Sequence, residues 1–302
     1  MKKTYVTVSE MQDFLKCQWR WFAKYRLNRV PRRWSDALIL GTAVHDIFEE
    51  HFKGETLTRA FDRQQGVLAH AAKAADPSEA VAIHKALKGL HAYRPQIVGF
   101  VDQFRVDETL EVEKAFELPL HIQSTDAARE VTAWYLQGRP DRVVLVNDVV
   151  YHYQHKTLAA NKSPDTFSQL VQRSMHEGLY GYYLAEKYNG SRVYGGTILN
   201  VVLKKVVEDP AKGGFQTIIK VDEVDRVRAW LRASAIVRAM VHAEKLAYMF
   251  GIDVLIDNPL EDGGPFGNSL DGYLPALTGK RKLDDPTYFM DREERYVPSE
   301  SD

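Results

Sequence analysis

The strongest constraint on the fold is a pair of strand-like segments, Arg142–Val146 and Val149–Thr157. Both segments are rich in β-branched and aromatic residues, which favour strands. Asn147-Asp148 separates them, and both residue types tolerate the left-handed backbone of a two-residue hairpin turn. The sequence therefore predicts an antiparallel hairpin that ends at Thr157.

An acid, an amide and a lysine give this hairpin its chemistry. Gly138-Arg-Pro-Asp141 precedes the first strand, and Gln154-His-Lys156-Thr157 lies on the second. Residues two apart share a strand face, so Gln154 and Lys156 are expected to point the same way, near Asp141. Two carboxylates and a lysine so arranged would hold Mg²⁺ or Mn²⁺ and hydrolyse a phosphodiester. Here Gln154 replaces the second acid, and its carbonyl oxygen brings no negative charge to a dication.

Composition limits the class of protein. The 302 residues are 45% hydrophobic and 27% charged, as in one large globular unit, and the formal net charge is −1. No apolar run approaches the roughly 20 residues of a membrane span, which predicts a soluble, intracellular protein, cytoplasmic or nucleoid-associated, with no membrane partner. The single cysteine, Cys17, excludes an internal disulfide and any site built from four cysteines of this chain.

A nucleic-acid partner therefore needs a local cationic patch, and one lies near the N-terminus. The segment from Lys16 to Arg33 has seven cations and no acid, interleaved with aromatics. Cations and aromatic faces together are typical of single-strand binding. The residues expected to contact nucleic acid are Arg20, Lys24, Arg29, Arg32, Arg33 and, on a later helix, Arg173. The alternative is an amphipathic helix from Ser9 to Tyr25, capped at Ser9, whose cations are solvated.

The rest of the chain alternates between helical and strand patterns. Helices are expected over 36–52, 164–188 and 224–249, and strands over 109–122, 131–137, 192–207 and 214–221. The region 56–106 is predicted to be helical, with breaks at 76–78 and 94–95. His45 lies at the edge of the apolar face of its helix, where an ordinary partly buried imidazole is the alternative to a functional role.

In their order along the chain these motifs resemble the PD-(D/E)xK nuclease superfamily, and within it the RecB-like exonuclease branch with its AddB-type and CRISPR-associated nucleases. Gly41-Thr-Ala-Val-His45 is similar to that branch's Gly-x-x-x-His motif, and Pro140-Asp141 resembles the first metal-binding acid. Val112-Glu-Lys-Ala-Phe116 resembles the strand with an additional acid. Tyr180 matches the Gln-x-x-x-Tyr motif in its tyrosine only, because His176 stands in place of the glutamine.

The resemblance implies an α/β, restriction-endonuclease-like core with a central mixed β-sheet flanked by helices, plus a helical lobe. It implies one nuclease-like domain over 1–250 with a helical insertion at about 56–106, and an irregular C-terminal extension over 251–302. The implied catalytic residues are Asp141, Gln154, Lys156 and Tyr180. The implied metal ligands are His45, Asp141 and Gln154, and the auxiliary residues are Glu113, His176 and Glu177.

The activity implied by the resemblance is Mg²⁺- or Mn²⁺-dependent hydrolysis of DNA from ends or on single strands. Iron–sulfur members of the branch carry three C-terminal cysteines that this sequence lacks, so no iron–sulfur cluster is expected. The expected partners are DNA and the proteins of a recombination, repair or viral, phage-like complex. A catalytically inert DNA-binding module and an interaction subunit on a relic nuclease core are the alternatives.

Two accounts of Gln154 remain open at this point. In the first, an acid was altered to its isosteric amide, and the unaltered protein is an active nuclease. In the second, Gln154 is native, and either another acid such as Glu177 supplies the charge or the site is inert. Glu113 taken alone is an ordinary strand-surface acid, and only the resemblance promotes it.

Overall fold

The computed structural model describes residues 2–31, 35–100, 102–125, 131–159, 163–172, 174–204, 209, 212–252, 255 and 289–291. The chain divides into two compact units. The first unit contains Met1–Arg33, Glu117–Gln137 and Leu231–Asp302, and the second contains Trp34–Phe116 and Gly138–Trp230. The proposed metal-binding and catalytic residues all belong to the second unit.

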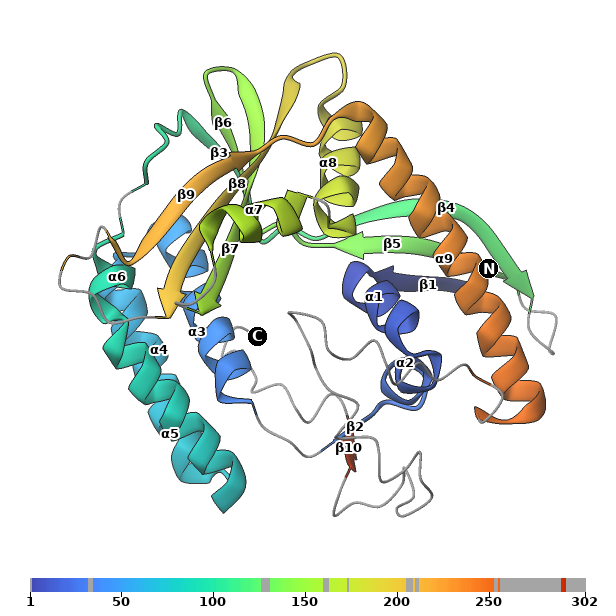
Figure 1. Ribbon diagram of the computed structural model, residues 1–302, viewed down its shortest axis with the longest axis horizontal. Coiled ribbons are helices and arrows are strands. Elements are labelled where there is room, and N and C mark those ends of the chain that lie inside the picture. Colours follow the sequence, from blue (N-terminus) through green and yellow to red (C-terminus); the bar gives the residue numbers. More distant parts are fainter. Residues whose placement is uncertain are drawn as a thin grey trace. The chain divides into compact units, whose positions relative to one another are not determined.

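A five-stranded mixed sheet is the framework of the second unit (Figure 1). In spatial order its strands are β3 (Glu108–Val112), β6 (Arg142–Val146), β7 (Val149–Ala159), β8 (Val193–Lys204) and β9 (Gly214–Ile219). β6 pairs antiparallel with β7, β7 pairs parallel with β8, and β8 pairs antiparallel with β9. The predicted α/β fold with a mixed sheet flanked by helices is confirmed.

The β6–β7 hairpin forms as the sequence predicts. Val146 pairs with Val149, so Asn147 and Asp148 make the two-residue turn. Both turn residues have positive φ, 50° and 63°, which the right-handed twist of the flanking strands favours. Because Arg142 pairs with Tyr153, the hairpin brings the start of β6 to the middle of β7.

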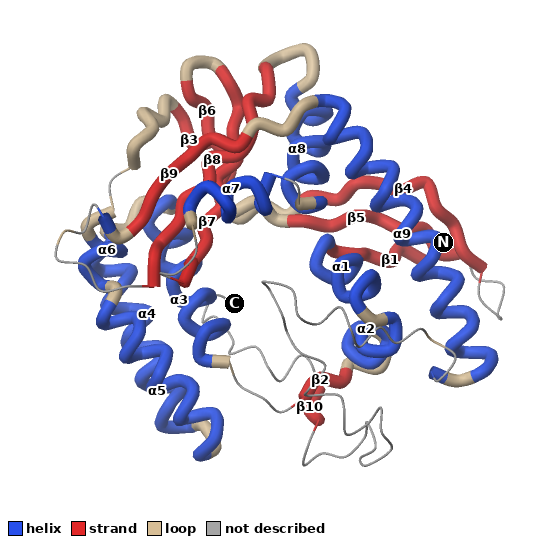
Figure 2. The backbone as a smooth tube through the Cα atoms, viewed as in Figure 1, coloured by secondary structure: helices blue, strands red, loops and turns tan. Residues whose placement is uncertain are grey.

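Helices cover opposite faces of this sheet, and side chains of β7 identify which helix covers which face. The His155 ring stacks on Phe48 of α3 (Asp36–Phe52) with 4.6 Å between ring centroids. The adjacent Gln154 points the other way, where its Nε2 lies 2.8 Å from Nδ1 of His176 on α8 (Met175–Tyr188). Figure 2 shows both helices in blue beside the red strands of the sheet. The predicted alternation along β7 is therefore confirmed.

The region 56–106, predicted to be helical, forms three helices of the second unit. They are α4 (Leu57–Ala74), α5 (Pro77–Ala92) and α6 (Arg94–Val98). Asp76 caps α5 through hydrogen bonds to two backbone N–H groups, and Pro77 occupies the first turn, which explains the predicted break. Apolar residues of α4 and α5 pack with those of α3 in one core, including Phe48, Phe61 and Leu90.

The first unit has a smaller sheet of its own, with strand order β1-β5-β4. β1 (Lys2–Thr7) pairs parallel with β5 (Val131–Gly138), and β4 spans Phe116–Thr125. The unit also contains α1 (Val8–Lys16), α2 (Gln18–Tyr25) and the C-terminal part of α9 (Glu223–Phe250). The short strand β10 (Phe289–Asp291) pairs antiparallel with β2 (Arg29–Pro31).

Three sequence predictions about element boundaries are wrong. The strand expected over 109–122 is two strands, β3 and β4, which belong to different sheets. The helix expected from Ser9 to Tyr25 breaks at Cys17, whose extended backbone begins a second helix, and Thr7 rather than Ser9 caps the first. The helix expected over 164–188 is α7 (Pro164–Gln172) followed by α8, which Ser174 caps.

The division into a domain over 1–250 and an extension over 251–302 stays a prediction. Most of the residues after Gly251 lie outside the described part of the chain. In the described part, none of the helices combines the length and the apolar character needed to cross a membrane.

Candidate metal centre

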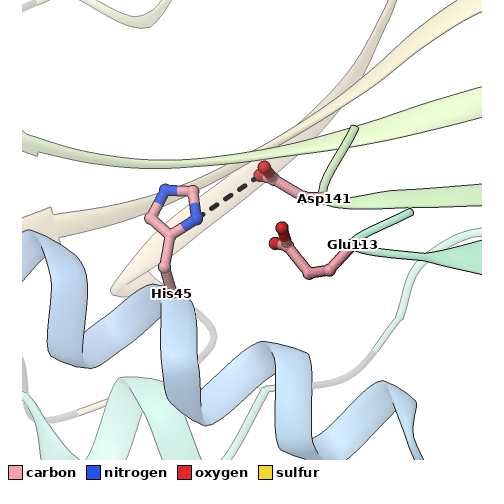
Figure 3. A group of neighbouring side chains, drawn as sticks. All are labelled: His45, Glu113 and Asp141. Carbon is pink, nitrogen blue, oxygen red and sulfur yellow. Dashed lines mark ion pairs between the residues drawn. The ribbon is translucent and has the colours of Figure 1, made fainter. Parts of the chain in front are cut away.

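Three side chains from separate elements converge in the second unit (Figure 3). His45 comes from the middle of α3, Glu113 follows β3, and Asp141 precedes β6. Their candidate ligand atoms all lie within 4.8 Å of one another. His45 Nδ1 is 3.6 Å from Asp141 Oδ2. All three side chains are partly exposed, so an ion has access to them.

The backbone before Asp141 is held from two sides. A Cβ on Gly138 would lie 2.6 Å from Cε1 of Phe116 and 2.8 Å from Cε1 of Tyr180, so only glycine fits there. The Tyr180 hydroxyl accepts a 3.0 Å hydrogen bond from the backbone N–H of Arg139. The His155 backbone N–H donates to Asp141 Oδ2 at 2.6 Å. Asp141 is therefore oriented before any ligand arrives.

The backbone at Glu113 turns its carboxylate towards Asp141. Glu113 has φ of 49°, a left-handed conformation that is uncommon outside glycine and that often marks functional positions. Its N–H donates to the Asp141 carbonyl oxygen at 3.1 Å, which ties the end of β3 to the start of β6. Glu113 Oε2 also lies 2.7 Å from Arg139 Nε. The second carboxylate beside Asp141 thus comes from Glu113.

The two carboxylates differ in their protonation. Burial, together with the negative charge of Asp141, raises the pKa of Glu113 to about 8. Burial alone would also raise the pKa of Asp141, but His45, Lys156 and the His155 N–H hold it below its usual value. Asp141 is therefore an anion at neutral pH, whereas Glu113 retains a proton that a dication would displace.

These donors fit a hard divalent cation. Carboxylate oxygens are the preferred ligands of Mg²⁺ and Mn²⁺, and an imidazole nitrogen is acceptable to Mn²⁺. Burial, and after it the charge of Asp141, disfavours an ionised Glu113, and a dication beside both carboxylates would offset this cost. When bound, the metal would polarise a phosphodiester and acidify a water molecule.

Gln154, the predicted third ligand, is buried against α8. It is 4% exposed, and its Nε2 lies 2.8 Å from His176 Nδ1. Its Oε1 is also buried, without a hydrogen-bond partner among the described residues. Lys156, two residues further along the same face of β7, is half-buried, and its charge contributes to the low pKa of Asp141. The charge of Lys156 thus acts on Asp141 of the centre, whereas the Gln154 side chain contacts His176 of α8.

The expectation that Glu177 supplies the charge that Gln154 lacks stays a prediction, and its side chain lies among other partners. It is fully buried, with Oε1 3.2 Å from His176 Nδ1 and Oε2 3.2 Å from His152 Nε2. The Thr197 hydroxyl donates to the same carboxylate. Burial would raise the pKa of Glu177, but the hydrogen bonds to the two histidines lower it strongly. The carboxylate therefore belongs to a separate buried network.

Tyr180, predicted to be catalytic, is 7% exposed, and its hydroxyl contacts the backbone N–H and carbonyl oxygen of Arg139. Burial raises the pKa of its hydroxyl far above the usual value, so the group stays protonated. Its ring packs edge-on against Phe116 at 5.3 Å between centroids. This placement describes a positioning residue for the loop that carries Asp141.

The predicted cationic patch is partly engaged within the first unit. Arg20 is 4% exposed and its guanidinium lies 3.3 Å from Asp13 Oδ1, so little of this side chain faces solvent and its phosphate contact stays a prediction. Lys24 Nζ is 2.7 Å from Asp13 Oδ2 and remains half-buried. Arg29 is half-buried in β2. Arg32, Arg33 and Arg173 lie outside the described residues.

Two residues of the centre had no strong signal in the sequence. Arg139 lies inside the Gly138-Arg-Pro-Asp141 motif, but nothing in its local pattern predicts an ion pair with Glu113, 26 positions earlier. His155 contributes through its backbone N–H, which any residue except proline would provide. Burial lowers the pKa of the His155 ring to about 3, and the ring stays neutral between α3 and β7.

One comparison with known proteins identifies the superfamily of this chain. A solved structure titled "Crystal structure of SSO0001" covers 76% of this chain and 87% of its own, at 12% identity and a TM-score of 0.26. No curated protein matches the sequence. The family profile described as "PD-(D/E)XK nuclease superfamily" matches residues 5–248. The RecB-like branch stays a prediction, but the chain belongs to the PD-(D/E)XK nuclease superfamily.

Proposed function

We propose that this protein is a divalent-metal-dependent deoxyribonuclease whose metal is held by His45, Glu113 and Asp141. The observation that carries the proposal is the convergence of their ligand atoms within 4.8 Å. Superfamily membership supports phosphodiester hydrolysis as the reaction. Glu113 supplies the second negative charge that the sequence lacks at Gln154. The centre is then complete with a neutral residue at position 154.

The residues around the metal ligands have separate tasks in this proposal. Lys156 orients the attacking water and stabilises the charge that develops on the phosphate. The His155 N–H and Tyr180 keep Asp141 in place. The water oxygen attacks phosphorus, one P–O ester bond breaks, and the leaving alcohol takes up a proton. The products are a phosphate monoester and an alcohol.

The substrate is proposed to be DNA, attacked at ends or on single strands. Support comes from the motif order that resembles the RecB-like branch and from the cations of the N-terminal segment. Two of the residues proposed to contact DNA in that segment, Lys24 and Arg29, are described by the structure and are partly exposed. Protein partners in recombination, repair or a viral complex belong to the same proposal.

Metal binding is expected to depend on pH through Glu113. Its raised pKa, about 8, means that a proton must leave before a dication binds. The apparent affinity for Mn²⁺ should rise about tenfold per pH unit as pH increases towards 8, and level off above it. Calorimetric titrations with Mn²⁺ at pH 6.5 to 9, in buffers of different ionisation enthalpy, measure both the affinity and the proton released.

The variant Glu113→Gln is the control for that pH dependence. It should bind Mn²⁺ more weakly, and its affinity should be nearly independent of pH between 7 and 9. A native protein whose affinity does not change over this range would contradict the assignment of Glu113 as a ligand.

Gln154→Glu distinguishes the two accounts of position 154. If Gln154 is native to a working site, the protein with Gln154 cuts labelled DNA with Mg²⁺ or Mn²⁺. Gln154→Glu then changes the rate by less than about tenfold, or about 1.4 kcal/mol. The physical reason is that the new carboxylate would face His176 beside the buried Glu177, rather than join Glu113 and Asp141.

The measurement is a cleavage assay of both forms on single- and double-stranded DNA, with EDTA as the metal-free reference. If Gln154→Glu cuts DNA and the protein with Gln154 does not, Glu113 fails to complete the centre. Position 154 was then an acid that has been altered to its amide. DNA binding that persists in EDTA, with no cutting by either form, would instead support the inert binding module.

A further inference from the structure

Arg139 is an exposed cation at the rim of the candidate metal centre. Its side chain is 61% exposed, whereas the carboxylate it contacts, that of Glu113, is 10% exposed. The contact joins Arg139 Nε to Glu113 Oε2 at 2.7 Å. Guanidinium presents five N–H donors in a planar fork. A side chain so exposed therefore has donors left for a ligand.

The backbone of Arg139 is fixed although its guanidinium is exposed. Its N–H donates to the Tyr180 hydroxyl at 3.0 Å, and that hydroxyl lies 3.4 Å from its carbonyl oxygen. Pro140, which is buried, restricts the residue before it to extended conformations. A fixed backbone with a long, exposed cationic side chain is suited to reaching a ligand above the centre without moving Asp141.

The charges around the centre create a need for such a cation. Glu113 and Asp141 bring two carboxyl groups to the centre, and Asp46 and Glu49 of α3 add two more to its surroundings. A phosphodiester carries a negative charge and is repelled by this acidic rim. Arg139, which contacts Glu113 directly, is a cation that offsets this repulsion.

A dication and Arg139 would also share one carboxylate. The Glu113 carboxylate carries a candidate ligand atom of the centre and is at the same time the partner of Arg139. A metal on Glu113 would compete with the guanidinium for the same carboxylate oxygens. Phosphate oxygens are the natural next partner, because the guanidinium fork matches their geometry bidentately.

We propose that Arg139 binds a non-bridging oxygen of the phosphodiester at this centre, and that it exchanges Glu113 for the phosphate when metal and DNA bind. This inference rests on the proposed function, because it takes the metal-loaded centre as the place where the phosphate lies. It assigns Arg139 as a substrate-binding residue rather than a tether for Glu113.

The test measures DNA and metal binding separately, with the full chain. A fluorescent single-stranded oligonucleotide with phosphorothioate linkages is titrated by anisotropy in Ca²⁺ and in EDTA, over a series of salt concentrations. Mn²⁺ affinity is measured by calorimetry without DNA. The variants are Arg139→Ala, Arg139→Lys and, as the matched control, Arg59→Ala, which removes an exposed arginine that also pairs with a glutamate.

With Ca²⁺, Arg139→Ala should weaken DNA binding about tenfold. The slope of log K against log salt should also fall by about 0.7, the value for one lost phosphate contact on a single strand. The loss should be smaller in EDTA, because the native guanidinium then remains on Glu113. Arg139→Lys should keep the salt slope, Arg59→Ala should behave as the native protein, and Mn²⁺ affinity should not fall in any variant.

Two results would overturn the inference. If Arg139→Ala loses Mn²⁺ affinity together with DNA affinity, the residue is a tether for Glu113. If the salt slope is unchanged, it contacts no phosphate. Failure of the proposed function would give a different result. Native protein that cuts no DNA with Mg²⁺ or Mn²⁺ would contradict the proposed nuclease activity. The binding comparisons would still decide the role of Arg139.

Discussion

Asp141→Asn is expected to abolish metal-dependent cutting, with a rate loss of roughly a thousandfold or more. Asparagine keeps an oxygen that can accept the hydrogen bond from the His155 N–H, so the loop before β6 should stay in place. What the variant loses is the one carboxylate of the centre that is ionised throughout the neutral range. Mn²⁺ affinity should fall by about a hundredfold in the same protein.

The matched control for this variant is Asp148→Asn. It makes the same chemical change at the tip of the β6–β7 hairpin, where φ is 63° and asparagine is as well tolerated as aspartate. Single-turnover cleavage and calorimetry should not separate Asp148→Asn from the native protein. If Asp141→Asn still cuts at the native rate with bound Mn²⁺, the centre is not the reaction site.

Lys156→Ala is expected to lower the cleavage rate by about a hundredfold to a thousandfold at saturating metal. The ammonium group is assigned to the developing charge and the attacking water, so its loss affects the transition state. Mn²⁺ affinity should stay equal or increase slightly, because Lys156 is one of the charges that lower the pKa of Asp141 and would repel a dication.

This split between rate and metal affinity distinguishes Lys156 from the ligands. Asp141→Asn should lose both quantities, whereas Lys156→Ala should lose only the rate. Lys212→Ala removes an 80% exposed lysine between β8 and β9 and should change neither quantity. Native cleavage by Lys156→Ala would show that position 156 has no role in the chemistry.

The hairpin was predictable from sequence because its determinants are local. Asn147-Asp148 favours the left-handed turn, and alternation along β7 decides that Gln154 and His155 face opposite helices. The order of the motifs predicted the mixed sheet with helices beside it. The resemblance predicted His45 and Asp141 as ligands of one metal, and in the structure their side chains lie close together.

From the sequence, only the resemblance assigned Glu113 an auxiliary role, because the strand pattern over 109–122 continues without interruption. The structure divides this segment between two sheets. Glu113 adopts a left-handed backbone conformation, which a glutamate in the sequence does not predict. The internal partners of the acid-free run after Lys16 were also not evident from the sequence. Arg20 and Lys24 of this run contact Asp13, which lies just before it. The contact depends on the break at Cys17, where α2 begins.

The most direct test of the account is the position of the metal itself. Crystals of the native protein soaked in Mn²⁺ should show an anomalous peak at coordination distance, about 2.0 to 2.3 Å, from His45, Glu113 and Asp141 together. A metal held by these three residues predicts this peak in the native protein and its loss in Asp141→Asn. A peak at His176 and Glu177, or one that leaves Glu113 uncoordinated, would contradict it.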